Sequence, residues 1–169
     1  MIHRVTLLTG PAASGKNTIA HVYATRYCDR CAVIDGDVVR AMLRQPHVAP
    51  WKGEEGLRQH RLGARHVCTL AQSFVREQYE VVLLDVLWAD LPQIYYEELE
   101  GYLFKIVRLM PTWEAALARL HERPPSISDE EARWVYETQV GLQDFDYSID
   151  NSAQTAEETT AEVALFIRG

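Results

Sequence analysis

Short apolar segments alternate along this chain with segments whose apolar residues recur at helical spacing. A short apolar run predicts a buried strand, and a period of about 3.6 residues predicts a helix with one buried face. Repeated alternation of the two predicts a mainly parallel α/β sheet with helices on both faces and ligands beyond the carboxyl ends of the strands. The expected strands cover residues 5–9, 32–34, 81–84, 104–109 and 147–149, and the expected helices cover 16–27, 37–43, 55–78, 91–99, 113–123, 129–142 and 157–167.

Length and charge narrow the classes of protein further. The 169 residues contain no internal repeat, low-complexity tract or Gly/Ser linker, so we expect a single domain over residues 1–169. A net charge of -7 argues against sequence-independent binding of nucleic acid. No apolar run approaches the roughly 18 residues that cross a bilayer, and the apolar start is too short for a secretory signal. We therefore expect no membrane partner and a cytoplasmic location.

Cysteine and histidine are poorly spaced for a metal site. Cys28 and Cys31 form one C-x-x-C pair, but no second pair accompanies it, so we interpret these residues and Cys68 as structural thiols. His60 and His66 share one expected helix without the spacing of zinc ligands, which favours hydrogen-bonded or surface histidines.

A glycine-containing segment follows the first expected strand directly. It reads Gly10-Pro-Ala-Ala-Ser-Gly-Lys16, fits the pattern G-x-x-x-x-G-K and opens the first expected helix. Such a loop points backbone N–H groups inward, the helix N-terminus adds positive potential, and the lysine reaches the outer phosphates. The segment therefore predicts a site for ATP. The predicted nucleotide-binding residues of this loop are Gly10, Ala12, Ala13, Ser14, Gly15, Lys16, Asn17 and Thr18.

The position after the lysine departs from the usual motif. Asn17 replaces the common Ser or Thr, and Thr18 comes next. The order Gly-Lys-x-Thr resembles adenylate and cytidylate kinases, in which magnesium is held mostly by phosphates and water. The apolar run Val81–Leu84 ends in Asp85, and a carboxylate at that end of a strand suits a magnesium-bound water. We therefore predict Mg²⁺ beside Asn17 and Asp85, with helix capping as the alternative role of Asp85.

The rest of the chain distinguishes between classes of P-loop protein. A switch GTPase needs a glycine turn after the second acidic motif and an Asn-Lys-x-Asp guanine reader, and the sequence has neither. A ring-forming mechanical ATPase usually carries a helical lid domain on a chain longer than 169 residues. The class that remains is a small kinase.

The second expected strand ends in Asp35-Gly-Asp37-Val-Val-Arg40, which resembles the Asp-Gly-Asp-x-x-Arg segment of adenylylsulfate kinases. The chain is also similar to chloramphenicol phosphotransferase over nearly its whole length, including the segment Asp85-Val-Leu-Trp. Gluconate and shikimate kinases share the same plan. The resemblance implies a P-loop NTPase fold of the nucleotide-kinase type, with five strands in the order 2-3-1-4-5 and a short lid at about residues 124–133.

The same resemblance implies that Asp37 is the general base. A carboxylate at the exit of the second strand faces the cleft of the phosphate loop, so it can take the proton of an acceptor hydroxyl. Asp35 is expected to point away. The alternative for Asp37 is to cap the short helix that it begins, and the two roles are compatible.

Arginines gather on the expected acceptor side. Arg40 lies one turn beyond Asp37, and Arg58, Arg61 and Arg65 form a stripe on the long helix. Arginines that converge there would suit an acceptor with a carboxylate, sulfate or phosphate group. The alternative is a solvated row in which neighbouring glutamates pair with the stripe. The predicted substrate-binding residues are Asp37, Arg40, Arg58, Arg61 and Asp85.

Arg119 and Arg123 lie just before Pro124-Pro125 and resemble the two arginines that bound the lid of nucleotide kinases. By that resemblance one stacks on adenine and the other neutralises charge on the transferred phosphoryl group. Lid closure would involve this turn and Arg133. The alternative is that the two arginines favour the dipole of a helix C-terminus. Residues 151–154 lie where such kinases wrap adenine with backbone groups.

Together these features predict an ATP- and Mg²⁺-dependent phosphotransferase that acts on a hydroxyl of a small molecule, with Asp37, Lys16 and Arg123 as catalytic residues. Two alternatives stay open: an ATP-binding regulator or degenerate kinase without transfer, and a nucleoside or nucleotide kinase. Trp51 and Trp88 either wall the acceptor pocket or pack in the core. The sequence leaves the acceptor, the choice between ATP and GTP, and the oligomeric state open.

Overall fold

Five parallel strands form one sheet at the centre of the protein. The structure is a computed structural model that describes residues 4–124 and 126–169, so the expectations for residues 1–3 and for Pro125 lie outside the described residues. The strands lie in the order β2-β3-β1-β4-β5, and all four neighbouring pairs are parallel. The predicted fold and strand order are therefore confirmed. The strands are β1 (Arg4–Thr9), β2 (Cys31–Asp35), β3 (Glu80–Leu84), β4 (Leu103–Leu109) and β5 (Tyr147–Ile149).

Helices connect the strands and cover both faces of the sheet. Their ends agree with the predicted ones to within about two residues, except at α2, which ends at Arg40 rather than at residue 43. There the backbone tightens, because Met42 and Leu43 donate to the carbonyl three residues back instead of four. The helices are α1 (Lys16–Arg26), α2 (Gly36–Arg40), α3 (Gly53–Arg76), α4 (Leu91–Glu98), α5 (Trp113–His121), α6 (Asp129–Gly141) and α7 (Ala156–Arg168).

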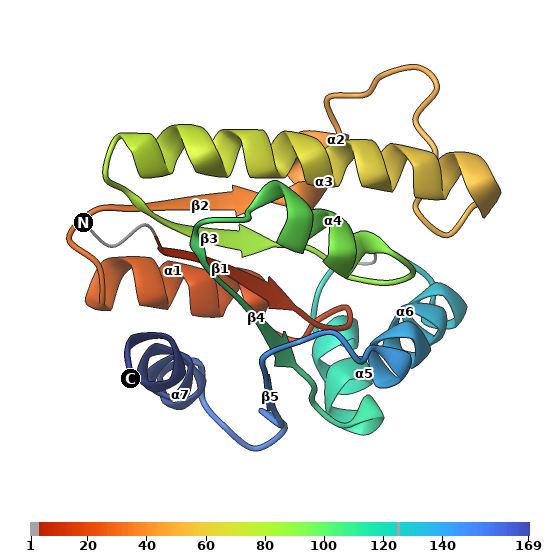
Figure 1. Ribbon diagram of the computed structural model, residues 1–169. Helices are drawn as coiled ribbons and strands as arrows, with labels where there is room; N and C mark the ends of the chain where they lie inside the picture. The colour runs from red at the N-terminus through yellow and green to blue at the C-terminus, as the bar shows by residue number, and fades with distance from the viewer. Residues whose placement is uncertain (1–3, 125) are drawn as a thin grey trace.

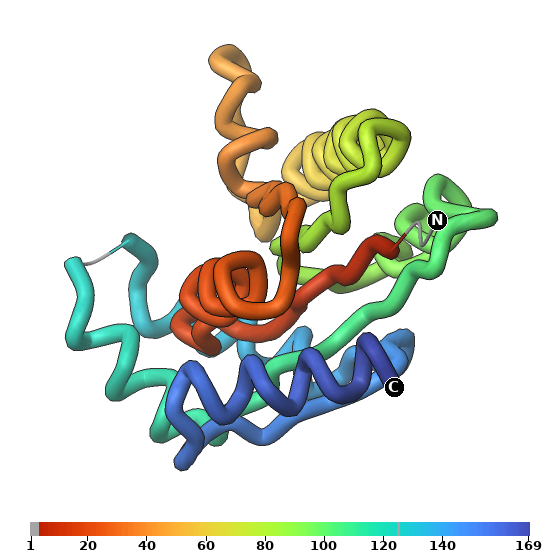
Figure 2. Tube along the Cα trace, turned by 90° about the vertical axis from the view of Figure 1, so that its left-hand side faces the viewer, coloured from red at the N-terminus to blue at the C-terminus, as the bar shows by residue number. Residues whose placement is uncertain are grey.

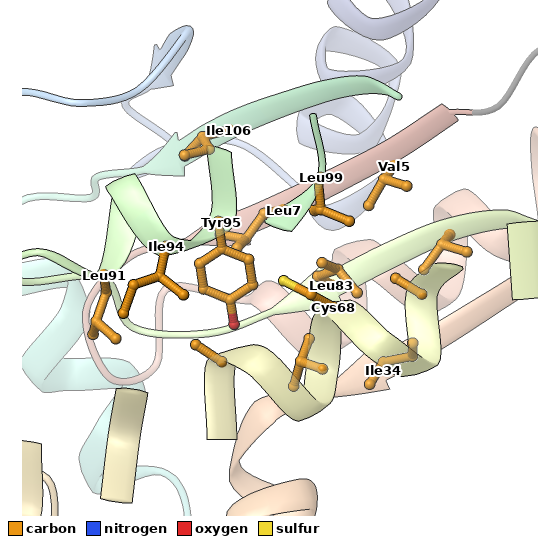
Figure 3. Packing of buried hydrophobic residues seen from close by; sticks show 14 of the residues in the cluster. Val5, Leu7, Ile34, Cys68, Leu83, Leu91, Ile94, Tyr95, Leu99 and Ile106 are labelled. Carbon is orange, nitrogen blue, oxygen red and sulfur yellow. The ribbon is translucent and has the colours of Figure 1, made fainter. Parts of the chain in front are cut away.

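The alternation of side chains along β1 divides the core into two layers. Val5 and Leu7 pack with buried residues of α3 and α4 on one face, as Figure 3 shows. Leu8 packs with α1 and α7 on the other face. Figures 1 and 2 both show α3 and α7 on opposite sides of the strands. No helix in the described part of the chain is both long and apolar enough to span a bilayer.

The carboxyl ends of the strands meet at one edge of the sheet. In Figure 1 the arrowheads of β1, β2 and β3 point toward the end of the molecule where α5 and α6 lie. Helix α6 begins at Asp129, as the sequence predicted, and the lid at about residues 124–133 stays a prediction. A capping box between Ser128 and Glu131 fixes that start, so residues 129–133 of the expected lid are helical.

Candidate active site

The phosphate loop joins β1 to α1 through two strained backbone positions that only glycine tolerates well. Gly10 has φ 149° and Gly15 has φ 96°. A Cβ on Gly10 would lie 2.3 Å from the carbonyl oxygen of Leu109, so a side chain there has no space. These two glycines let the chain reverse within six residues and start α1 at Lys16, as the sequence predicted.

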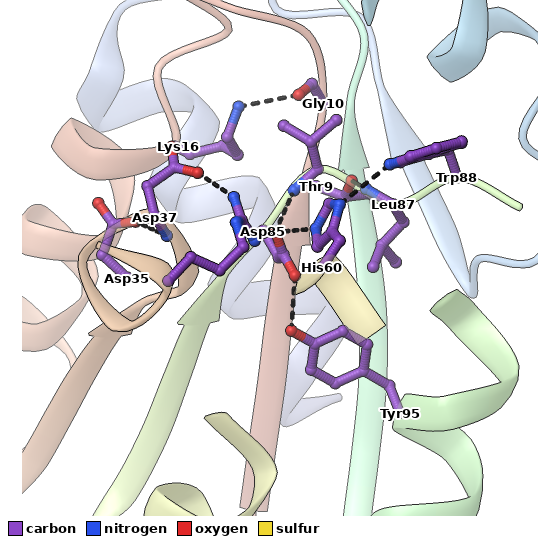
Figure 4. A network of polar contacts seen from close by, with 12 residues as sticks. Thr9, Gly10, Lys16, Asp35, Asp37, His60, Asp85, Leu87, Trp88 and Tyr95 are labelled. Carbon is purple, nitrogen blue, oxygen red and sulfur yellow. Dashed lines mark hydrogen bonds and ion pairs between the residues drawn. The ribbon is translucent and has the colours of Figure 1, made fainter. Parts of the chain in front are cut away.

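Lys16 curls back over the loop and finds no acidic partner. Its Nζ donates to the carbonyl oxygens of Gly10 at 2.8 Å and Pro11 at 2.9 Å, as Figure 4 shows for Gly10. Burial lowers the pKa of Lys16 to about 8, although nearby carboxylates, chiefly that of Asp37, oppose the shift. Among the described residues, no carboxylate forms an ion pair with it. A partly buried ammonium that is held by two carbonyl groups and by the Ser14 hydroxyl at 3.3 Å, with no counterion, is a site prepared for an anion.

The exit of β2 separates the roles of two aspartates. Asp35 caps α2, because its Oδ1 accepts from the backbone N–H of Asp37 at 2.9 Å. Its other oxygen accepts from Asn17 Nδ2 at 3.1 Å. Asp35 therefore faces the phosphate loop, and the expectation that it points away was wrong. The capping role considered for Asp37 falls to Asp35, so the Asp37 side chain remains exposed and contacts Arg40.

Asp85 lies beneath Arg40 with both carboxylate oxygens occupied. Its Oδ1 accepts from Arg40 Nη1 and from His60 Nε2, each at 2.9 Å, and its Oδ2 accepts from Tyr95 Oη at 2.8 Å. Burial disfavours the charged form, but His60 and Arg40 favour it more strongly and hold the pKa of Asp85 well below its ordinary value. Asp85 lines neither of the cavities described below. This position differs from the predicted one beside a metal-bound water.

An aromatic wall continues the network away from Asp85. Trp88 Nε1 donates to His60 Nδ1 at 3.0 Å, and an indole N–H can only donate. His60 Nε2 therefore carries the proton that it donates to Asp85 (Figure 4). Trp134 packs edge-on against Trp88 with ring centroids 5.2 Å apart. The chain of contacts fixes the tautomer of His60 and the orientation of Trp88.

The larger of two cavities beside the phosphate loop opens next to Asp37. It has a volume of about 460 Å³, and three of the four tryptophans of the chain line it. Trp51 and Trp88 were expected as candidates, whereas Trp134 and Gln59 were missed because helical spacing alone does not show which turn of α3 or α6 reaches a cavity. The lining includes Lys16, Asn17, Asp37, Arg40, Gln59, His60, Trp51, Trp88, Trp134 and Arg123.

A smaller cavity of about 180 Å³ lies on the other side of the phosphate loop. Ala13 and Arg123 line both cavities, so the two spaces meet at the loop. Arg119 Nη2 donates to the carbonyl oxygens of Asn151 at 2.7 Å and Ser152 at 3.1 Å, which holds the segment after β5 against this cavity. Asn151 Nδ2 donates to the carbonyl oxygen of Ser14 at 2.9 Å. The segment expected to wrap a base is thus fastened to the loop expected to bind phosphates.

The structure does not bring the arginine stripe of α3 to either cavity. Arg58 pairs with Glu55 on the surface, which is the alternative considered for it. Arg61 pairs with Asp90, and Arg65 pairs with Glu98. The stripe therefore connects α3 mainly to α4 and its N-terminus.

Arg133 also lies apart from the two cavities. It pairs with Glu137 and lies over the ring of Trp113, 4.9 Å from its centroid. Arg133 therefore connects α6 to α5, and its part in lid closure stays a prediction.

A dedicated metal cluster is absent from the part of the chain that the structure describes, where no three His, Cys, Asp or Glu residues are grouped as metal ligands. Magnesium keeps most of its water and is commonly held by one or two protein oxygens together with phosphates. Asn17 and Asp35 offer amide and carboxylate oxygens beside Lys16, and they fit such a site better than the enclosed Asp85 does.

The strand order and the loop between β1 and α1 define the P-loop NTPase fold, in the form found in small-molecule kinases. No family model and no curated protein matches the sequence. Among solved structures, a sugar kinase from a Janibacter species is similar with a TM-score of 0.75 at 16% identity, covering 98% of this chain and 94% of that one.

Two other solved kinases are similar over nearly their whole length. The APS kinase of Mycobacterium tuberculosis, solved with AMPPNP and APS, has a TM-score of 0.72 at 14% identity and covers 98% of both chains. The shikimate kinase of Acinetobacter baumannii, solved with shikimate, has a TM-score of 0.67 at 19% identity, covering 98% of this chain and 93% of that one. At these identities the likeness establishes the fold.

Proposed function

We propose that this protein is an ATP-dependent phosphotransferase that moves the γ-phosphoryl group to a hydroxyl of a small molecule. The observation that carries the proposal is the Lys16 ammonium, which is partly buried, has no acidic partner among the described residues and lines the same cavity as the exposed carboxylate of Asp37. One group is prepared for phosphate and the other for a proton. The kinase fold of the solved neighbours supports the same reaction class.

The two cavities divide the reactants. The smaller one, walled by Arg119 and the segment from Asn151, takes the base of the nucleotide. The triphosphate then runs over the phosphate loop, where backbone N–H groups and Lys16 receive it. Arg123 lines both cavities, so its guanidinium can contact the group in transfer and neutralise the charge that develops there.

The acceptor occupies the larger cavity with one hydroxyl between Asp37 and the γ-phosphate. As the hydroxyl oxygen bonds to phosphorus, its proton passes to the Asp37 carboxylate, and the bond from phosphorus to the β–γ bridging oxygen breaks to release ADP. Arg40 pairs with Asp85, which follows β3, and its contact with Asp37 orients the proposed base. Mg²⁺ held by Asn17 and Asp35 would neutralise the charge of the β- and γ-phosphates.

ADP production in the presence of ATP, Mg²⁺ and a panel of hydroxyl compounds tests this proposal. We expect at least one compound to accelerate ADP production in a saturable way, and Lys16→Met to bind ATP more weakly and to lose turnover. Binding of ATP without acceleration by any hydroxyl compound would instead favour a regulator or degenerate kinase. Acceleration only by nucleosides or nucleotides would identify the nucleoside or nucleotide kinase.

A further inference from the structure

The acceptor side of the larger cavity contains a cation whose charge is already balanced. Arg40 is only 7% exposed, and it pairs with Asp85 on one side and Asp37 on the other. One guanidinium thus faces two carboxylates, so the group carries no surplus positive charge for an anionic ligand. The remaining cations of the cavity, Lys16 and Arg123, lie at the phosphate loop and the lid.

Two other polar side chains on this side, Gln59 and His60, are also engaged. Gln59 donates its amide hydrogens to Pro46 and Glu55 and accepts from the backbone of Val48. His60 uses both ring nitrogens within the network described above. An acceptor carboxylate placed here would lose its hydration, would find these donors occupied and would lie close to Asp37.

The indole rings supply a different kind of contact. Trp51 donates its N–H to Glu131 at 3.0 Å and Trp88 donates its own to His60, so both rings are held in place by bonds that leave apolar surface for the cavity. Trp134 joins them from α6. Rigid aromatic walls favour planar apolar groups through burial and ring packing.

We infer that the acceptor is an uncharged hydroxyl compound with a planar apolar group, rather than the carboxylate, sulfate or phosphate that the arginine pattern of the sequence favoured. This inference rests on the proposed function. The hydroxyl lies toward Asp37 and the planar group lies among Trp51, Trp88 and Trp134. Because the charge of Arg40 is balanced by Asp37 and Asp85, Arg40 positions Asp37 and does not bind a charged group of the acceptor.

A matched pair of probes tests the inference by binding alone. 3-Phenylpropane-1,2-diol and 3-phenyllactate share a phenyl ring and a hydroxyl, but the second carries a carboxylate. We expect calorimetry of the ATP-analogue complex to show the diol binding at least about tenfold more tightly. Equal affinity, tighter binding of the hydroxy acid, or no binding of either compound would overturn the inference. Propane-1,2-diol, which lacks the ring, should bind more weakly than the phenyl diol.

Variants assign the effect to the cavity. Trp134→Leu should weaken diol binding by about tenfold and leave ATP binding unchanged, whereas Phe74→Leu, an exposed aromatic change outside both cavities, should change neither. Equal effects of the two changes would contradict the placement of the ring. Asp85→Asn removes one of the two carboxylates that balance the charge of Arg40, so the ratio of diol affinity to hydroxy-acid affinity should decrease. An unchanged ratio in a folded Asp85→Asn protein would contradict the inference.

ADP production with the same compounds separates the two claims. Acceleration by anionic acceptors alone would preserve the kinase and overturn the acceptor class. Tight diol binding without acceleration by any hydroxyl compound would preserve the cavity's chemistry and overturn the kinase.

Discussion

Arg40 links a buried carboxylate to an exposed one. Its Nη1 lies 2.9 Å from Asp85 Oδ1, and its Nη2 contacts Asp37 Oδ1. Asp85 has no exposed side-chain surface, whereas Asp37 is 78% exposed. Because Arg40 is held by the buried Asp85, its contact with Asp37 fixes the orientation of the proposed base. Without this contact, Asp37 would be an exposed side chain on the short helix α2.

Asp37→Asn removes the proposed base and keeps nearly the same shape. We expect kcat to fall by about 10²- to 10⁴-fold, because the amide cannot take the proton of the acceptor hydroxyl. The dissociation constant of ATP should stay within about twofold, since Asp37 does not belong to the phosphate loop. Steady-state ADP production and calorimetry measure the two quantities. Asp144→Asn, an exposed change outside both cavities, is the matched control, and an unaltered kcat in Asp37→Asn would remove Asp37 from the mechanism.

Asp85→Asn removes the charge that balances the buried side of Arg40. We expect the free energy of unfolding to fall by about 3–5 kcal/mol, because the change leaves a desolvated cation with only an exposed partner. Tyr95→Phe should cost less, about 1.5–3 kcal/mol, because it removes one hydrogen bond to a charged group. Urea unfolding measures both. A cost below that of Tyr95→Phe would show that the ion pair contributes little to folding.

The pH dependence of stability should report the same carboxylate. The folded-state pKa of Asp85 is depressed, so its contribution is present above the unfolded pKa of about 4 and is lost as pH falls from there toward the folded pKa. The wild type should therefore lose stability more steeply below about pH 4 than Asp85→Asn does. Urea midpoints measured from neutral to acidic pH test this difference, and parallel curves for the two proteins would contradict it.

The fold could be predicted from the sequence because local signals agreed with one another. The apolar run of β3, the glycines of the phosphate loop and the Ser128 capping box each act within a few residues. The site could be predicted only where it is equally local. Lys16 and Asp37 follow strand ends directly, and both line the larger cavity.

The roles that the sequence did not predict depend on contacts between residues far apart in the chain. Arg61 has the spacing of a substrate ligand, but the packing of α4 beside α3 places Asp90 next to it. Asp85 has the position of a metal ligand, but α3 contributes His60 and α4 contributes Tyr95 to occupy it. Partners at a separation of many residues depend on the register of packed helices, which a single sequence does not specify.

ATP affinity should fall as the pH rises through the pKa of Lys16. Burial lowers that pKa to about 8 in the free protein, and bound phosphates would raise it because they favour the charged form. Above about pH 8 most Lys16 side chains of the free protein are neutral, so Lys16 must take up a proton when ATP binds. The dissociation constant of ATP should therefore increase above this pH by up to about tenfold per pH unit. Calorimetry across this range measures the change. Lys16→Met should bind weakly with no such slope, and a flat wild-type profile would show that Lys16 does not meet the phosphates.

Gly63 on α3 provides the space that Arg40 occupies. A Cβ at this position would lie 2.5 Å from Arg40 Cγ, which is near the backbone end of a side chain already held by Asp85. Gly63→Ala must therefore displace the guanidinium, and we expect a loss of about 1–3 kcal/mol despite the higher helix propensity of alanine. Turnover should fall as well, because Asp37 loses the contact that orients it.

Gly141→Ala is the matched control for this change. Gly141 ends α6, and a Cβ there would meet no atom within 4 Å, so the substitution should leave stability unchanged or raise it by up to about 1 kcal/mol. Urea unfolding and ADP production compare the two variants directly. Equal stabilities and equal rates would show that α3 can move aside and that the position of Arg40 does not depend on the missing side chain. A loss in Gly63→Ala alone would establish that this glycine maintains the geometry of the proposed base from the opposite helix.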